Sequence, residues 1–73
     1  MNFKFAVIGG GAWGTAIANL LARLNNGTVI IWAKEKEVVN EINSQHKNSL
    51  FLEGIELEKN IYATDNISEA IAP

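Results

Sequence analysis

Three glycines at positions 9, 11 and 14 form the pattern G-x-G-x-x-G, whose residue types and spacing suit phosphate binding. Such a run holds the pyrophosphate of a dinucleotide when it joins a buried strand to a helix. Gly9 would allow a tight turn, Gly11 would let the backbone approach the phosphates, and Gly14 would let the helix pack closely on the sheet. The unpaired N–H groups of the first helical turn, those of Ala12 and Trp13 among them, would then point at the phosphates.

The whole run Gly9–Gly14, Gly10 included, is therefore predicted to bind a dinucleotide through its backbone. Its context carries the prediction, because the run follows an apolar strand pattern directly and opens an amphipathic helix pattern. The alternative is that the glycines form only a turn between strand and helix. Trp13 also has two interpretations, because it could contact the ligand, pack in the core, or do both.

The residue that chooses between NAD and NADP is expected about 20 positions after the glycines. Lys34 stands there, with Glu35 beside it. A lysine favours the 2′-phosphate of NADP, whereas a glutamate could hydrogen-bond the ribose of NAD. We therefore expect use of both cofactors with some tolerance of NADP. The alternative is that Lys34 is a solvated surface residue.

A strand, a helix and a second strand would position these residues. The short apolar run Phe3–Ile8 predicts a strand that is covered on both faces. Asn25-Asn26-Gly27 is expected to end the following helix, because asparagine and glycine tolerate the left-handed conformation. The run 28–33 then predicts a second buried strand. Apolar residues at helical spacing form one stripe of the helix between the strands: Trp13, Ala16, Ile17, Leu20, Leu21 and Leu24.

The rest of the chain continues the alternation of helix and strand. Residues 34–44 predict a second amphipathic helix, whose inward positions are Val38, Val39 and Ile42. Residues 45–60 have no clear period and predict a long loop, of a kind that is often functional.

Residues 61–64 predict a third strand, and Asp65 or Ser68 is expected to cap a short last helix. The resulting order β-α-β-α-β-α is an α/β fold, the first half of a doubly wound parallel sheet of the Rossmann type, cut before its fourth strand.

The composition excludes several classes of function. Of 73 residues, 48% are hydrophobic and 19% charged, and the net charge of -2 gives no reason to expect nucleic acid or an anionic membrane as partner. The chain has no cysteine, and its only histidine, His46, has no close acidic pair, so no metal site is predicted. The apolar run that ends at Ile8 is too short for a signal peptide or a membrane span, so we expect a cytoplasmic protein.

Four segments, in this order, resemble the N-terminal part of the NAD(P)-dependent glycerol-3-phosphate dehydrogenases: GGGAWGTAIANLLA, VIIWAKE, INSQHKNSLFLEG and NIYATDNISEAI. The likeness covers nearly all 73 residues. The stretches 13–16 and 42–52 are more specific to that family than the glycines are.

The resemblance implies a cytoplasmic oxidoreductase that interconverts sn-glycerol 3-phosphate and dihydroxyacetone phosphate with NAD or NADP, for phospholipid synthesis. Carried onto this sequence, it places cofactor contacts at 9–14, at Lys34 and at Phe51, for which packing alone is the alternative. The family's catalytic lysines and substrate domain match no residue here. Residues 1–73 are thus expected to be the N-terminal part of an NAD(P)-binding domain, without catalytic residues and inactive alone.

A second class of function stays open, namely a non-catalytic nucleotide-binding or assembly module with the same half-fold. In a doubly wound sheet of order 3-2-1-4-5-6, the first strand becomes an edge when the fourth is absent. We therefore expect the isolated chain to associate with itself through its first strand. Binding of the adenosine and pyrophosphate groups would survive weakly, and hydride transfer would not.

Overall fold

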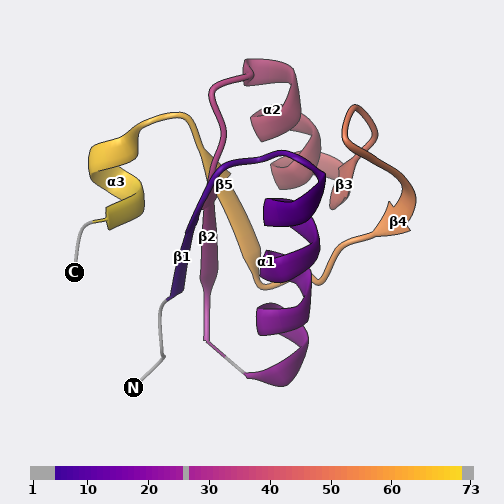
Figure 1. Ribbon diagram of the computed structural model, residues 1–73, viewed down its shortest axis with the longest axis horizontal. Helices are drawn as coiled ribbons and strands as arrows, with labels where there is room; N and C mark the ends of the chain where they lie inside the picture. Colours follow the sequence, from indigo (N-terminus) through magenta and orange to yellow (C-terminus); the bar gives the residue numbers. More distant parts are fainter. Residues whose placement is uncertain (1–4, 26, 72–73) are drawn as a thin grey trace.

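The computed structural model describes residues 5–25 and 27–71, which form a small parallel sheet with helices on both faces (Figure 1). The predicted strand start at residues 3 and 4 and the predicted turn residue Asn26 lie outside this range. In chain order the elements are β1 (Phe5–Ile8), α1 (Ala12–Leu24), β2 (Val29–Trp32), α2 (Lys36–Gln45), β3 (Lys47–Asn48), β4 (Leu52–Glu56), β5 (Ile61–Thr64) and α3 (Ile67–Ile71).

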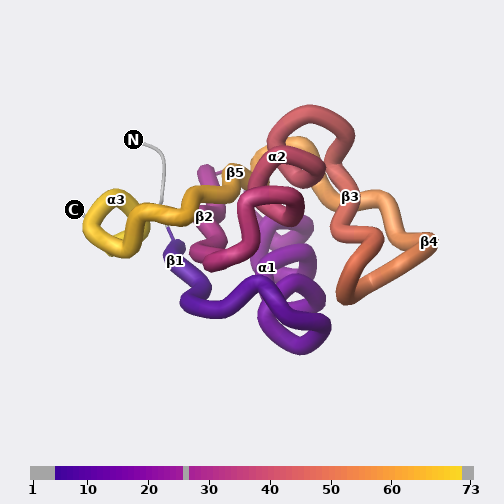
Figure 2. Tube along the Cα trace, turned by 90° about the horizontal axis from the view of Figure 1, so that it is seen from above, coloured from indigo at the N-terminus to yellow at the C-terminus, as the bar shows by residue number. Residues whose placement is uncertain are grey.

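The sheet has the order β1-β2-β5, with both pairs parallel. Helices α1 and α2 cover one face, and α3 lies on the other side of the sheet (Figure 2). This is the arrangement expected for the first half of a doubly wound sheet, so the predicted α/β class is confirmed. β1 is an edge strand within the described residues, as predicted.

The core lies between the sheet and the two helices on its covered face. Its strand residues are β-branched or small, and α1 contributes small side chains, which let the helix axis come close to the sheet. Buried hydrophobic members are Ala18, Ala22, Val29, Ile31, Ala33, Val38, Ile42, Leu57, Ile61 and Ala63. Val38 and Ile42 are inward, as predicted, whereas Val39 is half-buried.

Most of the large apolar residues of α1 lie off its buried face, and of the predicted stripe only Leu21 packs partly buried against the core. Trp13 is 85% exposed and Leu24 72% exposed, and Ile17 and Leu20 are exposed as well. The side that meets the sheet carries Thr15, Ala18, Asn19 and Ala22, which recur with the same helical spacing. The core interpretation of Trp13 is therefore wrong.

β1 also differs from its prediction as a strand covered on both faces. Phe5 and Val7 pack against the core, whereas Ala6 and Ile8 are exposed. An edge strand lacks a neighbour on one side, and the five-residue helix α3 leaves part of its other face open.

The predicted long loop after α2 contains a second, two-stranded antiparallel sheet. β3 pairs with β4, with Lys47 opposite Glu56 and Asn48 opposite Leu52. The register shifts between Lys47 and Asn48, and β4 is mostly exposed, so the segment has no alternating pattern for a sequence to reveal.

Two helix ends differ from the predicted ones. Asn66 accepts hydrogen bonds from the N–H groups of Ser68 and Glu69 at the start of α3, a role predicted for Asp65 or Ser68. Asn25, at the end of α1, is extended rather than left-handed. No helix in the described part of the chain is long and apolar enough to cross a membrane.

Candidate functional site

The predicted site residues meet at the edge of the sheet where the parallel strands have their carboxyl ends. Ile8 of β1 lies opposite Trp32 of β2, and the Gly9 N–H donates to the Trp32 carbonyl over 2.9 Å. The glycine run therefore begins beside the end of β2, and Lys34 follows two residues after Trp32. Open α/β sheets bind their ligands outside this edge.

Three of the four glycines of the run are required by the protein itself, each for a different reason. Gly9 has φ +125°, a conformation that other residues rarely adopt. A Cβ on Gly14 would overlap the carbonyl oxygen of Gly9, and a Cβ on Gly10 would lie 2.5 Å from the Cβ of Ala33. Gly9, Gly10 and Gly14 are thus explained by the turn and by its packing.

Gly11 is different, because a Cβ there would meet nothing within 4 Å. Its φ of -73° and ψ of -174° suit any residue, so neither conformation nor internal packing calls for glycine. A side chain at position 11 would, however, fill the open space in front of the backbone. The alternative that the glycines form only a turn accounts for Gly11 through its place as helix N-cap, where Ser, Thr, Asp and Asn serve as well as glycine.

The start of α1 is suited to an anion. Gly11 is the N-cap residue, no side chain of the described residues caps the helix, and its first turn carries no acidic residue. The Thr15 N–H bonds the Gly11 carbonyl over 2.9 Å. The N–H groups of Ala12, Trp13 and Gly14 precede this first helical bond, and the positive end of the helix dipole lies behind them. The exposed indole of Trp13 stands beside this turn.

Lys34 is exposed just beyond β2, and within the described ranges it forms no ion pair. Its neighbour Glu35 begins α2, where its backbone carbonyl accepts the N–H groups of Val38 and Val39 over 3.1 Å. The carboxylate of Glu35 takes no part in this capping. The side chains of Lys34 and Glu35, which stand where the residue that selects the cofactor is predicted, are therefore both available to a ligand.

A buried asparagine, which the sequence analysis did not single out for the site, joins the glycine run to the β3–β4 hairpin. The Asn48 side chain is fully buried, and its Nδ2 donates to the Gly10 carbonyl over 2.9 Å and to Thr15 Oγ1 over 2.8 Å. Thr15 Oγ1 donates in turn to the Gly10 carbonyl over 3.2 Å. Asn48 Oδ1 accepts the N–H of Phe51 over 3.3 Å.

This contact brings Phe51 into the neighbourhood of the glycine run. Phe51 lies in the turn between β3 and β4 and is 38% exposed. The turn is also tied to α2, because Glu41 accepts hydrogen bonds from the Ser49 hydroxyl over 2.5 Å and the Ser49 N–H over 2.8 Å. These two hydrogen bonds, with Lys47 nearby, hold the pKa of Glu41 below its usual value.

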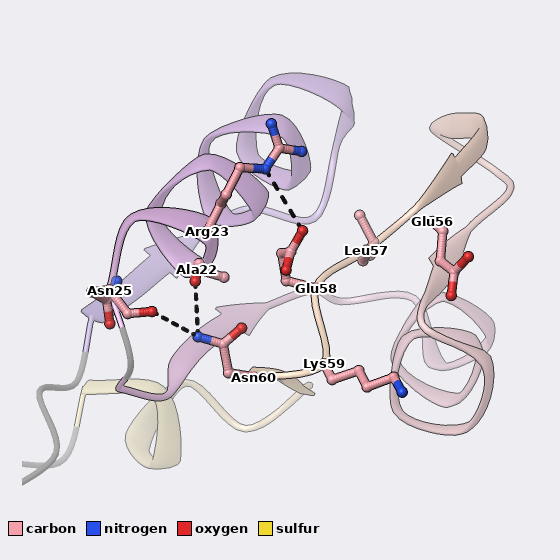
Figure 3. Close-up of a pocket in the computed structure, with 8 residues that line it drawn as sticks. All are labelled: Ala22, Arg23, Asn25, Glu56, Leu57, Glu58, Lys59 and Asn60. Carbon is pink, nitrogen blue, oxygen red and sulfur yellow. Dashed lines mark hydrogen bonds and ion pairs between the residues drawn. The ribbon is translucent and has the colours of Figure 1, made fainter.

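A hollow of about 670 Å³ lies at the other end of the sheet and is lined by the end of α1 and the connection from β4 to β5 (Figure 3). The Asn60 amide donates there to the carbonyls of Ala22 and Gly27 over 3.0 and 2.8 Å, and Arg23 pairs with Glu58 over 3.7 Å. These polar groups bind one another and brace the turn before β2, so this hollow is structural.

A family model described as "NAD-dependent glycerol-3-phosphate dehydrogenase N-terminus" matches residues 4–73. The glycerol-3-phosphate dehydrogenase [NAD(P)+] of Erythrobacter litoralis is 49% identical over 72 residues, which are 99% of this chain and 22% of that protein. The protein of the same name from Staphylococcus carnosus is 48% identical over 93% of this chain and 20% of its own length. The chain thus spans about a fifth of these relatives.

Solved structures agree with the sequence comparison. A glycerol-3-phosphate dehydrogenase from Plasmodium falciparum superposes with a TM-score of 0.86 at 29% identity, over 97% of this chain and 22% of that one. The enzyme from Coxiella burnetii gives a TM-score of 0.83 at 27% identity, over 96% of this chain and 21% of its own.

Proposed function

The chain belongs to the family of NAD-dependent glycerol-3-phosphate dehydrogenases, and from this premise we propose that it holds the adenosine and pyrophosphate groups of NAD or NADP. The observation that carries the proposal is the open space at Gly11, in front of an uncapped helix end. A ligand that approaches the backbone closely gives this position a reason to be glycine beyond the general preference for glycine at a helix N-cap.

Each predicted residue has a role in this proposal. Gly9, Gly10 and Gly14 shape the turn, and the backbone of Gly11, Ala12 and Trp13 faces the pyrophosphate. Lys34 meets the adenosine ribose or its 2′-phosphate, and Phe51 covers the nucleotide from the hairpin. The position of Lys34 two residues beyond β2 and the bond from Asn48 to the Phe51 N–H support these roles.

The activity proposed for the longer protein is the interconversion of sn-glycerol 3-phosphate and dihydroxyacetone phosphate, a cytoplasmic step that supplies phospholipid precursors. Residues 1–73 act in it as the N-terminal part of the NAD(P)-binding domain and contribute no catalytic residue.

Titration of the chain with NADP tests the site. Gly11→Val should abolish measurable binding by calorimetry while circular dichroism stays that of the folded chain, because the added side chain meets only open space. Ala16→Val adds a similar branched side chain to the exposed face of α1 one turn later and serves as the matched control. Equal affinity of Gly11→Val and the unaltered chain would refute the site.

The choice of cofactor has its own test at Lys34. Replacing Lys34 by Asp should lower the affinity for NADP relative to NAD, because the carboxylate repels the 2′-phosphate and accepts from the ribose hydroxyls. An unchanged ratio of the two affinities would show that Lys34 is only a solvated surface residue.

An assembly role has one observation in its favour, the exposed apolar residues of α1 next to the edge strand β1. Trp13, Ile17, Leu20 and Leu24 are exposed apolar side chains, of a kind that marks protein contacts, and β1 is an edge strand of the sheet within the described residues. Self-association of the isolated chain is therefore part of the proposal. A clean monomer in sedimentation at high protein concentration would exclude it.

A further inference from the structure

We propose that Asn48 is a positioning residue, which sets the direction of the Gly10–Gly11 peptide and so aims the Gly11 N–H at the phosphate. This inference deepens the proposed function and rests on it. It concerns a residue of the β3–β4 hairpin, 38 positions away from Gly10 in the chain.

Hydrogen bonds hold the carbonyl oxygen of Gly10 in one direction. This oxygen accepts two hydrogen bonds, from Asn48 Nδ2 over 2.9 Å and from Thr15 Oγ1 over 3.2 Å, and both donors are buried. The carbonyl therefore points into the protein. In a trans peptide the N–H of the next residue points the opposite way, and the described chain has no cis peptide bond. The N–H of Gly11 consequently points away from Asn48.

The Asn48 amide, in turn, has only one orientation that satisfies its hydrogen bonds. Its two N–H bonds go to Gly10 and to Thr15, and its oxygen receives the N–H of Phe51. Rotating the amide by half a turn would place its oxygen against the Gly10 carbonyl oxygen, remove the shorter of the two hydrogen bonds to that carbonyl and leave the Phe51 N–H without its acceptor. Every polar atom of this buried side chain is thus satisfied in the observed orientation alone.

Without these hydrogen bonds, the Gly10–Gly11 peptide could reorient easily. It lies between two glycines and follows Gly9, whose φ is +125°, so the usual steric barriers to reorientation are weak. A turned peptide would present the Gly10 carbonyl oxygen, instead of the Gly11 N–H, to an anion. Each turned molecule is unable to bind, and the apparent affinity falls by the fraction that remains competent.

The same amide couples this peptide to the other side of the site. Because Asn48 Oδ1 holds the Phe51 N–H, the hairpin turn that carries Phe51 and the glycine run share one buried group. The hairpin is thereby part of the nucleotide site, although it contributes no phosphate-binding group of its own.

The test compares Asn48→Ala with Asn43→Ala, a matched control that removes the same side chain elsewhere. Asn43 also makes two hydrogen bonds to backbone, with the Ala63 carbonyl and N–H over 2.9 and 2.8 Å, but it lies on α2 against β5. Asn48→Ala should weaken NADP binding about tenfold, as expected if about a tenth of the molecules keep the peptide competent. Asn43→Ala should change it less than twofold after correction for the folded fraction.

Two readouts separate positioning from a general loss of structure. Adenosine 2′-monophosphate lacks a pyrophosphate, so Asn48→Ala should lower its affinity by a clearly smaller factor than the affinity for NADP. In the ligand-free chain, NMR relaxation dispersion should detect exchange of the Gly11 amide in Asn48→Ala and none in Asn43→Ala. Equal losses of NADP affinity in the two variants, or a Gly11 amide that stays fixed, would overturn the proposal.

Should Asn48→Ala fail to fold, Thr15→Val tests the same bond network with a side chain of similar shape. It removes one of the two donors to the Gly10 carbonyl and should weaken NADP binding in the same direction by a smaller factor. An unchanged affinity in Thr15→Val would count against the proposal. If the unaltered chain binds no dinucleotide, the proposed function fails, whereas the exchange of the Gly11 amide still decides the role of Asn48.

Discussion

Adding a single methyl group should lower stability at Gly14 and leave it almost unchanged at Gly11. In Gly14→Ala the new Cβ overlaps the Gly9 carbonyl oxygen, a backbone atom that cannot rotate away. Overpacking of this kind costs about 1–3 kcal/mol, and the better helix propensity of alanine returns about 1 kcal/mol. Because the neighbour is backbone, we place the cost near the upper end of the range and expect a net loss of about 2 kcal/mol.

Gly11→Ala meets nothing within 4 Å and keeps an ordinary backbone conformation. Reduced freedom of the unfolded chain should stabilise it by about 0.4–1 kcal/mol, and the poorer N-cap should cost a similar amount. The free energy of unfolding should therefore change by less than about 0.5 kcal/mol.

Urea unfolding followed by circular dichroism measures both variants, with an unchanged slope against urea as the check that the same surface is exposed. A chain of this size has only a few kcal/mol of stability, so a loss of about 2 kcal/mol moves the midpoint clearly. If Gly11→Ala loses as much stability as Gly14→Ala, the space at Gly11 is not open, and the argument for a ligand there fails.

Two further predictions concern α2. Asn43→Ala should lower the free energy of unfolding in urea by about 1–3 kcal/mol, because the backbone N–H and carbonyl of the buried Ala63 in β5 both lose their partner. A loss below about 0.5 kcal/mol would contradict this reason. The lowered pKa of Glu41 means that its bonds to Ser49 stabilise the fold above the ordinary pKa of 4.5, and that this stability is lost as the pH falls through the lowered pKa. The stability difference between the unaltered chain and Glu41→Gln should therefore be constant near neutral pH and vanish in acid, and a difference independent of pH would contradict it.

The sequence predicted the parallel strands and the helices between them, because each has a strong local signal. The run 28–33 is continuously apolar, and α1 has apolar residues at helical spacing. The same helical spacing predicted the wrong buried face for α1. Two stripes of the helix have this spacing, and the prediction chose the one with the larger side chains. The sheet lies against Thr15, Ala18 and Ala22, whose small side chains permit the close approach that Gly14 also serves.

The hairpin and its asparagine could not be predicted in this way. β3 is two residues long and its register with β4 shifts, so no period marks it. The bonds from Asn48 to Gly10 and Thr15 span more than 30 positions, and nothing local in the sequence indicates them. By contrast, the glycines could be assigned to the site because their requirement is local, a turn directly between a strand and a helix.

The stretch 42–52, which was predicted to be more specific to the family than the glycines, makes contacts that reach across the fold. Gly9, Gly10 and Gly14 are required by the local turn and its packing, so their presence says little about the rest of the site. The stretch carries two asparagines with long-range tasks: Asn43 satisfies the edge strand β5, and Asn48 holds the carbonyl of Gly10. A segment with these tasks is useful only in a fold that brings a hairpin beside the glycine run. Its residues therefore specify the assembled site, whereas the glycines specify one turn of it.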